Sequence, residues 1–141
     1  MTLAGRCHCG NLRIEFETAL DPHTLPLRAC QCAFCRAHGA VSVSDPAGSL
    51  RVRVMEERGL ARYRFGLGVT DFFICRRCGV YVLAVAELAW ERYAVINANT
   101  LECRDQLDGT IQPMDYASDT KESRAERRRH RWTPVTALDM S

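Results

Sequence analysis

The chain has 141 residues, of which 47% are hydrophobic and 26% charged, and its formal net charge is +2 at pH 7. This length suits one domain with a hydrophobic core. A net charge so close to zero does not by itself indicate a nucleic-acid or membrane partner. The first residues lack a secretory signal, and no apolar run reaches the roughly 18 residues that span a bilayer. We therefore expect a cytoplasmic protein without a membrane partner, whose eight cysteines serve metal binding or catalysis rather than disulfides.

Most predicted elements are short β-strands separated by Asp-Pro and glycine turns. Three stretches alternate apolar with polar side chains, as half-buried antiparallel strands do: residues 11–17, 50–55 and 61–65. Three later stretches are more continuously apolar, which indicates strands covered on both faces: residues 70–75, 80–86 and 93–99. The pattern predicts a mainly β fold of antiparallel sheets.

Helical character is confined to short stretches. The sequence AFCRAH, residues 33–38, predicts one or two helical turns that end at Gly39. Residues from about 115 to 130 are polar and charged, and predict a surface segment that is either a loop or a short helix. No repeat or linker divides the chain, so we expect residues 1–141 to form a single domain.

Two cysteine pairs, far apart in the sequence, are each followed by a glycine. Cys7 and Cys9 stand in CHCG, and Cys75 and Cys78 stand in CRRCG. Glycine suits a tight metal-binding turn because it can adopt a positive φ. Two such pairs can build a closed zinc site of four thiolates, whose role is to hold the fold. The alternative is that these cysteines are buried thiols packed as small hydrophobic residues.

A third cluster places three cysteines within six residues: Cys30, Cys32 and Cys35. An extended segment followed by a helical turn can direct three sulfurs toward one ion. Three thiolates leave the fourth tetrahedral position for water or substrate, as in a catalytic zinc site. Two alternatives are a cluster without metal and a site closed by a fourth protein ligand, for which the candidates are Cys103, His38 and His23.

Five motifs together resemble the glutathione-dependent formaldehyde-activating enzyme family, which also includes centromere protein V. In chain order they are GRCHCGNLRIEFE, CQCAFC, CRRCGVYV, VINANTL and RRRHRWTPV. The resemblance implies a β-tent fold stapled by a structural zinc on the four paired cysteines. It also implies a second zinc on the three-cysteine cluster, hence two zinc ions per chain, of which the second can be lost on isolation. The activity it implies is condensation of glutathione with formaldehyde to S-hydroxymethylglutathione.

The chemistry of the three-cysteine cluster fits such an activity. Coordination to zinc deprotonates a thiol, and attack of the sulfur on an aldehyde carbon gives a hemithioacetal, whose cleavage is a lyase reaction. We therefore expect a zinc-dependent carbon–sulfur lyase that acts on small thiol adducts, with Cys30, Cys32 and Cys35 catalytic through bound zinc. Arginines close in sequence to the clusters are expected to offset negative charge: Arg28, Arg36, Arg76 and Arg77.

Two other functions are consistent with the sequence. A zinc-stabilised binding module would use the basic run from Arg127 to Arg131, although a nucleic-acid partner is disfavoured because Trp132 is the only aromatic residue beside that run. A redox sensor would form a disulfide within the three-cysteine cluster once zinc leaves.

Overall fold

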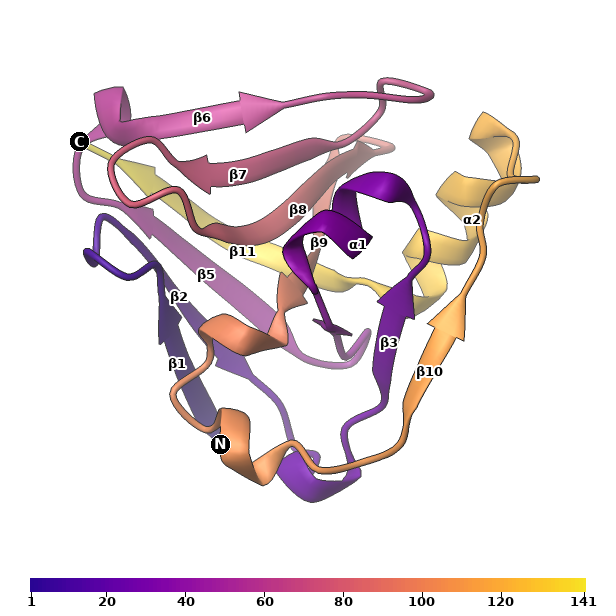
Figure 1. The fold of residues 1–141 in the computed structure, drawn as a ribbon, viewed down its shortest axis with the longest axis horizontal. Coiled ribbons are helices and arrows are strands. Elements are labelled where there is room, and N and C mark those ends of the chain that lie inside the picture. The colour runs from indigo at the N-terminus through magenta and orange to yellow at the C-terminus, as the bar shows by residue number, and fades with distance from the viewer.

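The computed structural model describes all 141 residues and shows a mainly β protein with few short helices (Figure 1). The strands are β1 (Thr2–Arg6), β2 (Leu12–Glu17), β3 (Leu27–Cys30), β4 (Ser42–Val43), β5 (Ser49–Val54), β6 (Leu60–Tyr63), β7 (Asp71–Cys75), β8 (Tyr81–Leu88), β9 (Glu91–Asn97), β10 (Ile111–Met114) and β11 (Thr133–Met140). The α-helices are α1 (Ala33–His38) and α2 (Lys121–Arg131). Four single 3₁₀ turns complete the secondary structure: η1 (Pro22–Thr24), η2 (Glu57–Gly59), η3 (Ala98–Thr100) and η4 (Arg104–Gln106).

All eleven strands belong to one branched, mixed sheet. Its main path runs β1-β2-β5-β11-β9-β4-β3-β10, and β8, β7 and β6 branch from β9. The predicted mainly β class is confirmed, and most neighbouring strands are antiparallel as expected. Two pairs are parallel instead, β5 with β11 and β3 with β10. Each parallel partner arrives from far along the chain, and parallel strands require such long connections, so local alternation of side chains could not reveal these pairs.

Burial along the strands follows the two patterns expected from the sequence. In β2 the side chains of Leu12, Ile14 and Phe16 are buried while their neighbours are exposed, and β5 alternates in the same way. In β8 every residue from Tyr81 to Ala86 is buried, as in a strand covered on both faces. Each of these three strands contributes three side chains to the main hydrophobic core of 23 buried residues.

A second, smaller hydrophobic cluster of seven buried residues lies apart from the main core. It joins Cys35 of α1 to Tyr81 of β8 and to Trp132, which directly follows α2. Elements from the beginning, middle and end of the chain therefore meet at one place.

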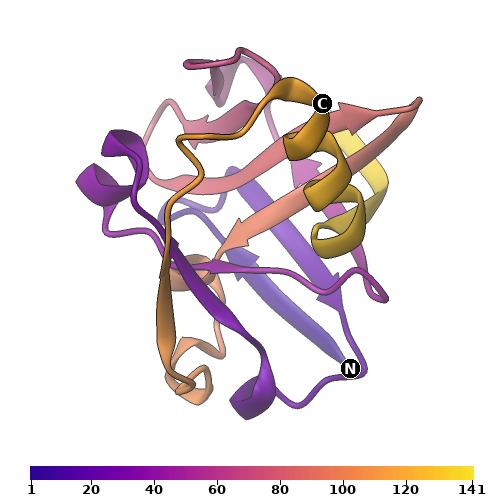
Figure 2. The ribbon, with the colours of Figure 1, turned by 90° about the vertical axis from the view of Figure 1, so that its right-hand side faces the viewer.

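The helix α2 covers this second cluster from the side facing the viewer in Figure 2, together with β3 and β10. Its first turn is closed by a capping box between Thr120 and Ser123, which satisfies backbone N–H groups that would otherwise lack partners. The helix ends at Trp132, whose backbone N–H donates to the carbonyl of Arg128 at 2.8 Å. Neither α2 nor any other helix of the structure is long and apolar enough to cross a membrane.

Candidate metal centre and the cavity beside it

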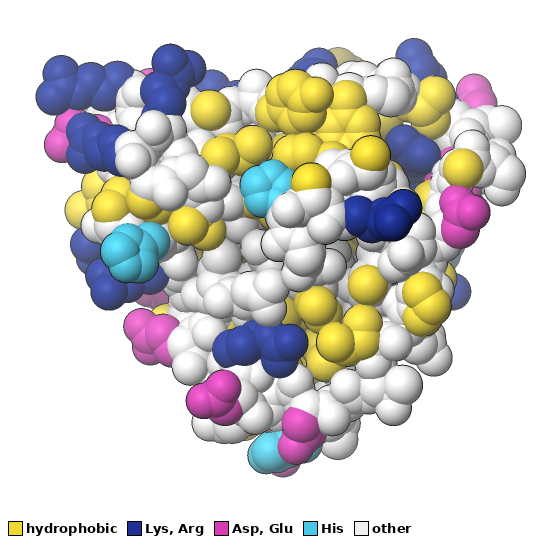
Figure 3. All heavy atoms as spheres, viewed as in Figure 1, with side chains coloured by type: hydrophobic (Ala, Val, Ile, Leu, Met, Phe, Trp, Pro, Cys, Tyr) yellow, Lys and Arg dark blue, Asp and Glu magenta, His cyan; other side chains and the backbone are white.

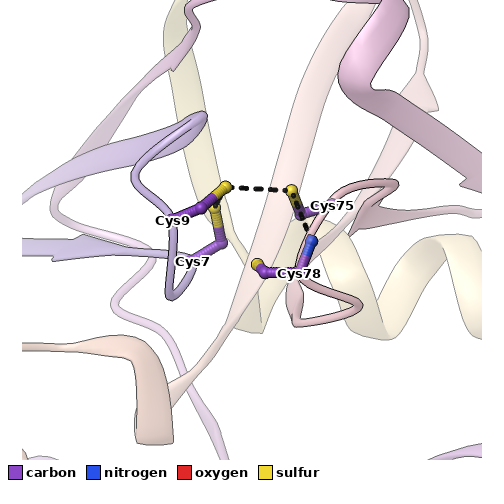
Figure 4. A group of neighbouring side chains, drawn as sticks. All are labelled: Cys7, Cys9, Cys75 and Cys78. Carbon is purple, nitrogen blue, oxygen red and sulfur yellow. Dashed lines mark hydrogen bonds between the residues drawn. The ribbon is translucent and has the colours of Figure 1, made fainter.

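The four paired cysteines meet between two turns, one joining β1 to β2 and the other joining β7 to β8 (Figure 4). Their Sγ atoms all lie within 4.8 Å of one another. Cys7 Sγ and Cys9 Sγ are 3.8 Å apart, and Cys9 Sγ and Cys75 Sγ are 3.5 Å apart. A tetrahedral zinc site with Zn–S bonds of about 2.3 Å places its sulfurs about 3.8 Å apart. All eight cysteines are free thiols, so the cluster fits a metal ion and contains no disulfide.

The local backbone explains why the two pairs form similar turns. Gly10 and Gly79 have φ values of 83° and 78°, in the left-handed region that glycine adopts without strain. Their N–H groups donate to the carbonyls of Cys7 and Cys75, at 3.1 and 2.8 Å, and so close each turn. The backbone N–H of Leu12 also donates to Cys7 Sγ, at 3.3 Å. Such N–H donors stabilise a negatively charged sulfur.

The three remaining clustered cysteines meet where β3 leads into α1. The Sγ atoms of Cys30, Cys32 and Cys35 lie within 4.8 Å of one another. Cys32 is the N-cap of α1, and its sulfur accepts a hydrogen bond from the backbone N–H of Cys35 at 3.4 Å. The extended strand followed by a helical turn therefore brings the three sulfurs together, and this donor set also fits a soft metal ion.

None of the candidates for a fourth ligand joins this second cluster. Cys103 packs against the main core, and His23 pairs with Asp108 at the surface at 3.0 Å. The ring of His38 lies 4.6 Å from that of Phe34, centroid to centroid. The cluster therefore offers three protein ligands.

The thiols of Cys30 and Cys35 differ in acidity. Hydrogen bonding from Cys35, helped by the backbone N–H of Cys32 and by the charge of Arg127, lowers the pKa of Cys30 to about 5. The same hydrogen bond and burial raise the pKa of Cys35. The surroundings thus favour a thiolate at Cys30, the ionisation state that a metal ion requires.

A cavity of about 220 Å³ opens directly onto the three-cysteine cluster. One wall is aromatic, formed by Phe65, Phe72, Tyr81 and Trp132. Phe34 of α1 extends this wall, with ring centroids 5.3 Å from Phe65 and 4.6 Å from Phe72. In the view of Figure 3, hydrophobic side chains gather near the top of the molecule, over α1 and the β6–β7 hairpin. The cysteines therefore border a cavity that is largely apolar on one side.

The other wall of the cavity is basic. It contains Arg28 of β3 and three arginines of α2, Arg124, Arg127 and Arg128. Among the arginines expected to offset charge, only Arg28 lies here, because Arg36, Arg76 and Arg77 are exposed at the surface. The α2 arginines were not predicted as site residues, although their spacing of three and four residues is the signal that places them on one helical face.

The positions of Arg127, which is partly buried, and of Arg128, which is buried, also bear on the predicted basic run. The two side chains line the cavity, and only Arg129, His130 and Arg131 are exposed. The run is therefore divided between the interior and the surface, and does not form one continuous basic patch.

The fold and the two sulfur clusters define a mainly β protein with two groups of cysteines suited to metal ions, one of four sulfurs between two turns and one of three sulfurs beside a cavity. Comparison with known proteins agrees with this class. Residues 2–116 match the model of the family described as glutathione-dependent formaldehyde-activating enzyme. The chain belongs to this family, as the sequence motifs predicted.

Two individual proteins are similar to the chain. A Halomonas elongata protein that carries the provisional name of glutathione-dependent formaldehyde-activating enzyme is 33% identical over 86 residues. The match covers 55% of this chain and 52% of that protein, so the chain spans about half the length of this relative. A crystal structure of a Rhodobacter sphaeroides protein has a TM-score of 0.56 and 30% identity, and the match covers 79% of this chain and 99% of that one.

Proposed function

We propose that the protein is a zinc-dependent carbon–sulfur lyase that forms and cleaves hemithioacetals of small thiols beside Cys30, Cys32 and Cys35. The observation that carries this proposal is a three-sulfur cluster without a fourth protein ligand, open to a cavity. Membership of a family whose reaction activates formaldehyde with glutathione supports the same chemistry. The four-cysteine cluster would hold a second zinc ion that joins the two turns and stabilises the sheet as a β-tent.

Zinc bound by the three cysteines would supply a position at which a substrate thiol is deprotonated and nucleophilic. In the overall reaction a carbon–sulfur bond forms as the thiol adds to the carbonyl of an aldehyde. The carbonyl π electrons move to oxygen, and the oxygen takes up the proton that the thiol has lost. The aromatic wall limits the access of water to the reacting atoms.

Tyr81 is our candidate for the group that transfers this proton. It lines the cavity, and burial and the neighbouring thiols raise the pKa of its hydroxyl well above the usual value, so the phenol is neutral. No group of the protein hydrogen-bonds this hydroxyl. A neutral phenol of this kind can donate to the oxygen on which negative charge develops.

The proposal is tested by exchange of formaldehyde with its hemithioacetal, followed by NMR with glutathione and with smaller thiols. The zinc-loaded protein should accelerate the exchange of at least one such pair. Cys32→Ser should abolish the acceleration, while circular dichroism shows an intact β fold. Serine is a favourable N-cap, so this substitution removes a metal ligand and keeps the start of α1.

Cys103→Ser is the matched control, because Cys103 is a thiol outside both clusters. It should leave the exchange rate unchanged. If zinc-loaded wild type accelerates no exchange, or if Cys32→Ser retains the acceleration, the lyase proposal is wrong.

A further inference from the structure

The arginines of α2 form a stripe along one face of the helix. Arg124, Arg127, Arg128 and Arg131 follow the spacing i, i+3, i+4 and i+7, which aligns their side chains. In surface helices such a stripe is usually apolar and faces the core. Here the first three of these arginines line the cavity beside the cysteines, so the inward face of α2 is cationic.

Two of these guanidinium groups, those of Arg127 and Arg128, each keep one buried N–H donor without a hydrogen bond. Arg128 is only 7% exposed, donates to Thr70 Oγ1 at 2.5 Å and lies 4.2 Å from the Trp132 ring. It has no carboxylate partner, and its Nε is buried without a hydrogen bond. The Nε of Arg127 is also buried and unpaired. Buried charges and donors are costly unless paired, so these groups indicate a missing acceptor.

Negative charge within the protein does not balance the four arginines of the cavity. Asp119 pairs with Arg127 at 2.6 Å and with Arg124 at 3.5 Å, and so offsets one charge. The carboxylate that lines the cavity itself, that of Asp115, is exposed to solvent. A zinc ion with three thiolates has a net charge of −1, and a bound substrate thiolate makes it −2. One guanidinium charge is still left for a further anionic group.

The volume of the cavity limits the size of the ligand. A cavity of about 220 Å³ is smaller than the roughly 300–1,000 Å³ of pockets for drug-sized molecules. The helix α2 also lies beyond residues 2–116, the part of the chain that matches the family model. Three of the four arginines of the basic wall therefore lie beyond the residues that match the family model, and Arg28 lies within them.

We propose that the arginines of α2, with Arg128 at their centre, form a carboxylate subsite, and that the protein selects small thiols that also carry a carboxylate. The sulfur would occupy the three-cysteine site while the carboxylate accepts hydrogen bonds from the guanidinium groups. This inference rests on the proposed function for the sulfur end of the ligand. A guanidinium with a carboxylate is the stronger, charge-assisted kind of hydrogen-bonded pair.

The test compares two thiols of similar size, 3-mercaptopropionate and neutral 3-mercaptopropanol, on the cobalt(II)-substituted protein at constant ionic strength. Binding is measured from the thiolate-to-cobalt absorption. We expect 3-mercaptopropionate to bind about tenfold more tightly than the alcohol, as a charge-assisted hydrogen bond allows. Glutathione, a larger thiol, is expected to bind more weakly than 3-mercaptopropionate; tighter binding would overturn the size limit.

Two substitutions in α2 test whether Arg128 causes the preference for the carboxylate thiol. Arg128→Gln should remove the preference for the carboxylate, whereas Arg129→Gln should retain it, because Arg129 is exposed and pairs with Glu126. Equal affinities for both thiols in wild type, or an equal loss for both in Arg128→Gln, would overturn the subsite. Should Arg128→Gln not fold, the wild-type comparison of the two thiols decides the question.

Propionate, which has no sulfur, separates failure of this inference from failure of the proposed function. Bound at the arginines, it should raise the melting temperature of wild type and of Arg129→Gln but not that of Arg128→Gln. If no thiol changes the cobalt spectrum but propionate stabilises in this way, the lyase proposal fails and the anion subsite stands. If thiols change the spectrum but propionate has no effect and the carboxylate gives no advantage, the subsite is wrong.

Discussion

The four-cysteine cluster lies between two turns of the sheet, away from the cavity, whereas the three-cysteine cluster lies where β3 meets α1 and borders it. The first joins segments that are 66 residues apart, as the contact between Cys9 and Cys75 shows. The second uses a single stretch from Cys30 to Cys35, and its neighbours are arginines and aromatic rings. In the proposed function, the number of sulfurs and their surroundings, rather than the residue type, separate a stabilising role from a chemical one.

The largest expected difference between the clusters is in stability. Cys75→Ser should leave the protein unfolded or insoluble, because a structural zinc contributes roughly 10–16 kcal/mol of apparent binding energy, about the whole stability of a domain. Cys32→Ser should fold and bind one zinc fewer. Thermal melting by circular dichroism and metal analysis measure both effects. A Cys75→Ser protein that melts like wild type would refute the structural assignment.

Removal of metal by a chelator should also separate the clusters. The three-cysteine site has one ligand fewer and opens onto a cavity, so its metal should leave first, with the far-ultraviolet circular dichroism unchanged. Loss of the second metal should coincide with unfolding. Metal content and circular dichroism followed over time test this order, and simultaneous loss of both metals would contradict it.

Within the cavity, Tyr81→Phe should slow the exchange of formaldehyde with its hemithioacetal about a hundredfold, the lower range for a general acid. The hydroxyl has no partner in the protein, so the melting temperature should change little. Tyr93→Phe is the control, since the Tyr93 hydroxyl donates to Glu91 outside the cavity. Equal exchange rates for wild type and Tyr81→Phe would exclude Tyr81 as the proton donor.

The smallest effect is expected at Asp119. Asp119→Asn removes the carboxylate that pairs with Arg124 and Arg127 and leaves the basic wall more positive. The affinity for 3-mercaptopropionate should rise about two- to fivefold, as the modest strength of such pairs suggests. Titration of the cobalt(II) forms of wild type and of Asp119→Asn with 3-mercaptopropionate measures the two affinities. A lower affinity would instead indicate that Asp119 orients the arginines for binding.

The sequence contained most of the information for the cysteine clusters. Short spacings indicated both groups, trailing glycines marked the two pairs of the four-cysteine cluster, and alternation of side chains placed β2 and β5 correctly. The structure brings together the four paired cysteines and the three of the second cluster as their spacing suggested. These features are local, so they can be read from neighbouring residues.

The basic wall of the cavity could not be found in the same way. Residues 115–130, expected to be a polar surface segment, include much of α2, and Arg128 within it is buried. Arginine side chains are usually exposed. Arg128 is buried because α2 packs against strands that are distant in the sequence. The parallel strands β10 and β11 were missed for a related reason, since their partners lie far away in sequence.

The position of β11 has a consequence for the assembly of the molecule. The last strand of the chain lies in the interior of the sheet, paired with β5 on one side and with β9 on the other (Figure 1). During synthesis, the edges of β5 and β9 that pair with β11 therefore stay unpaired until residues 133–140 have left the ribosome. Because α2 directly precedes β11, the same late event closes the sheet and brings the arginines to the cavity. A chain shortened by its last ten residues would thus lose a central strand rather than a dispensable tail.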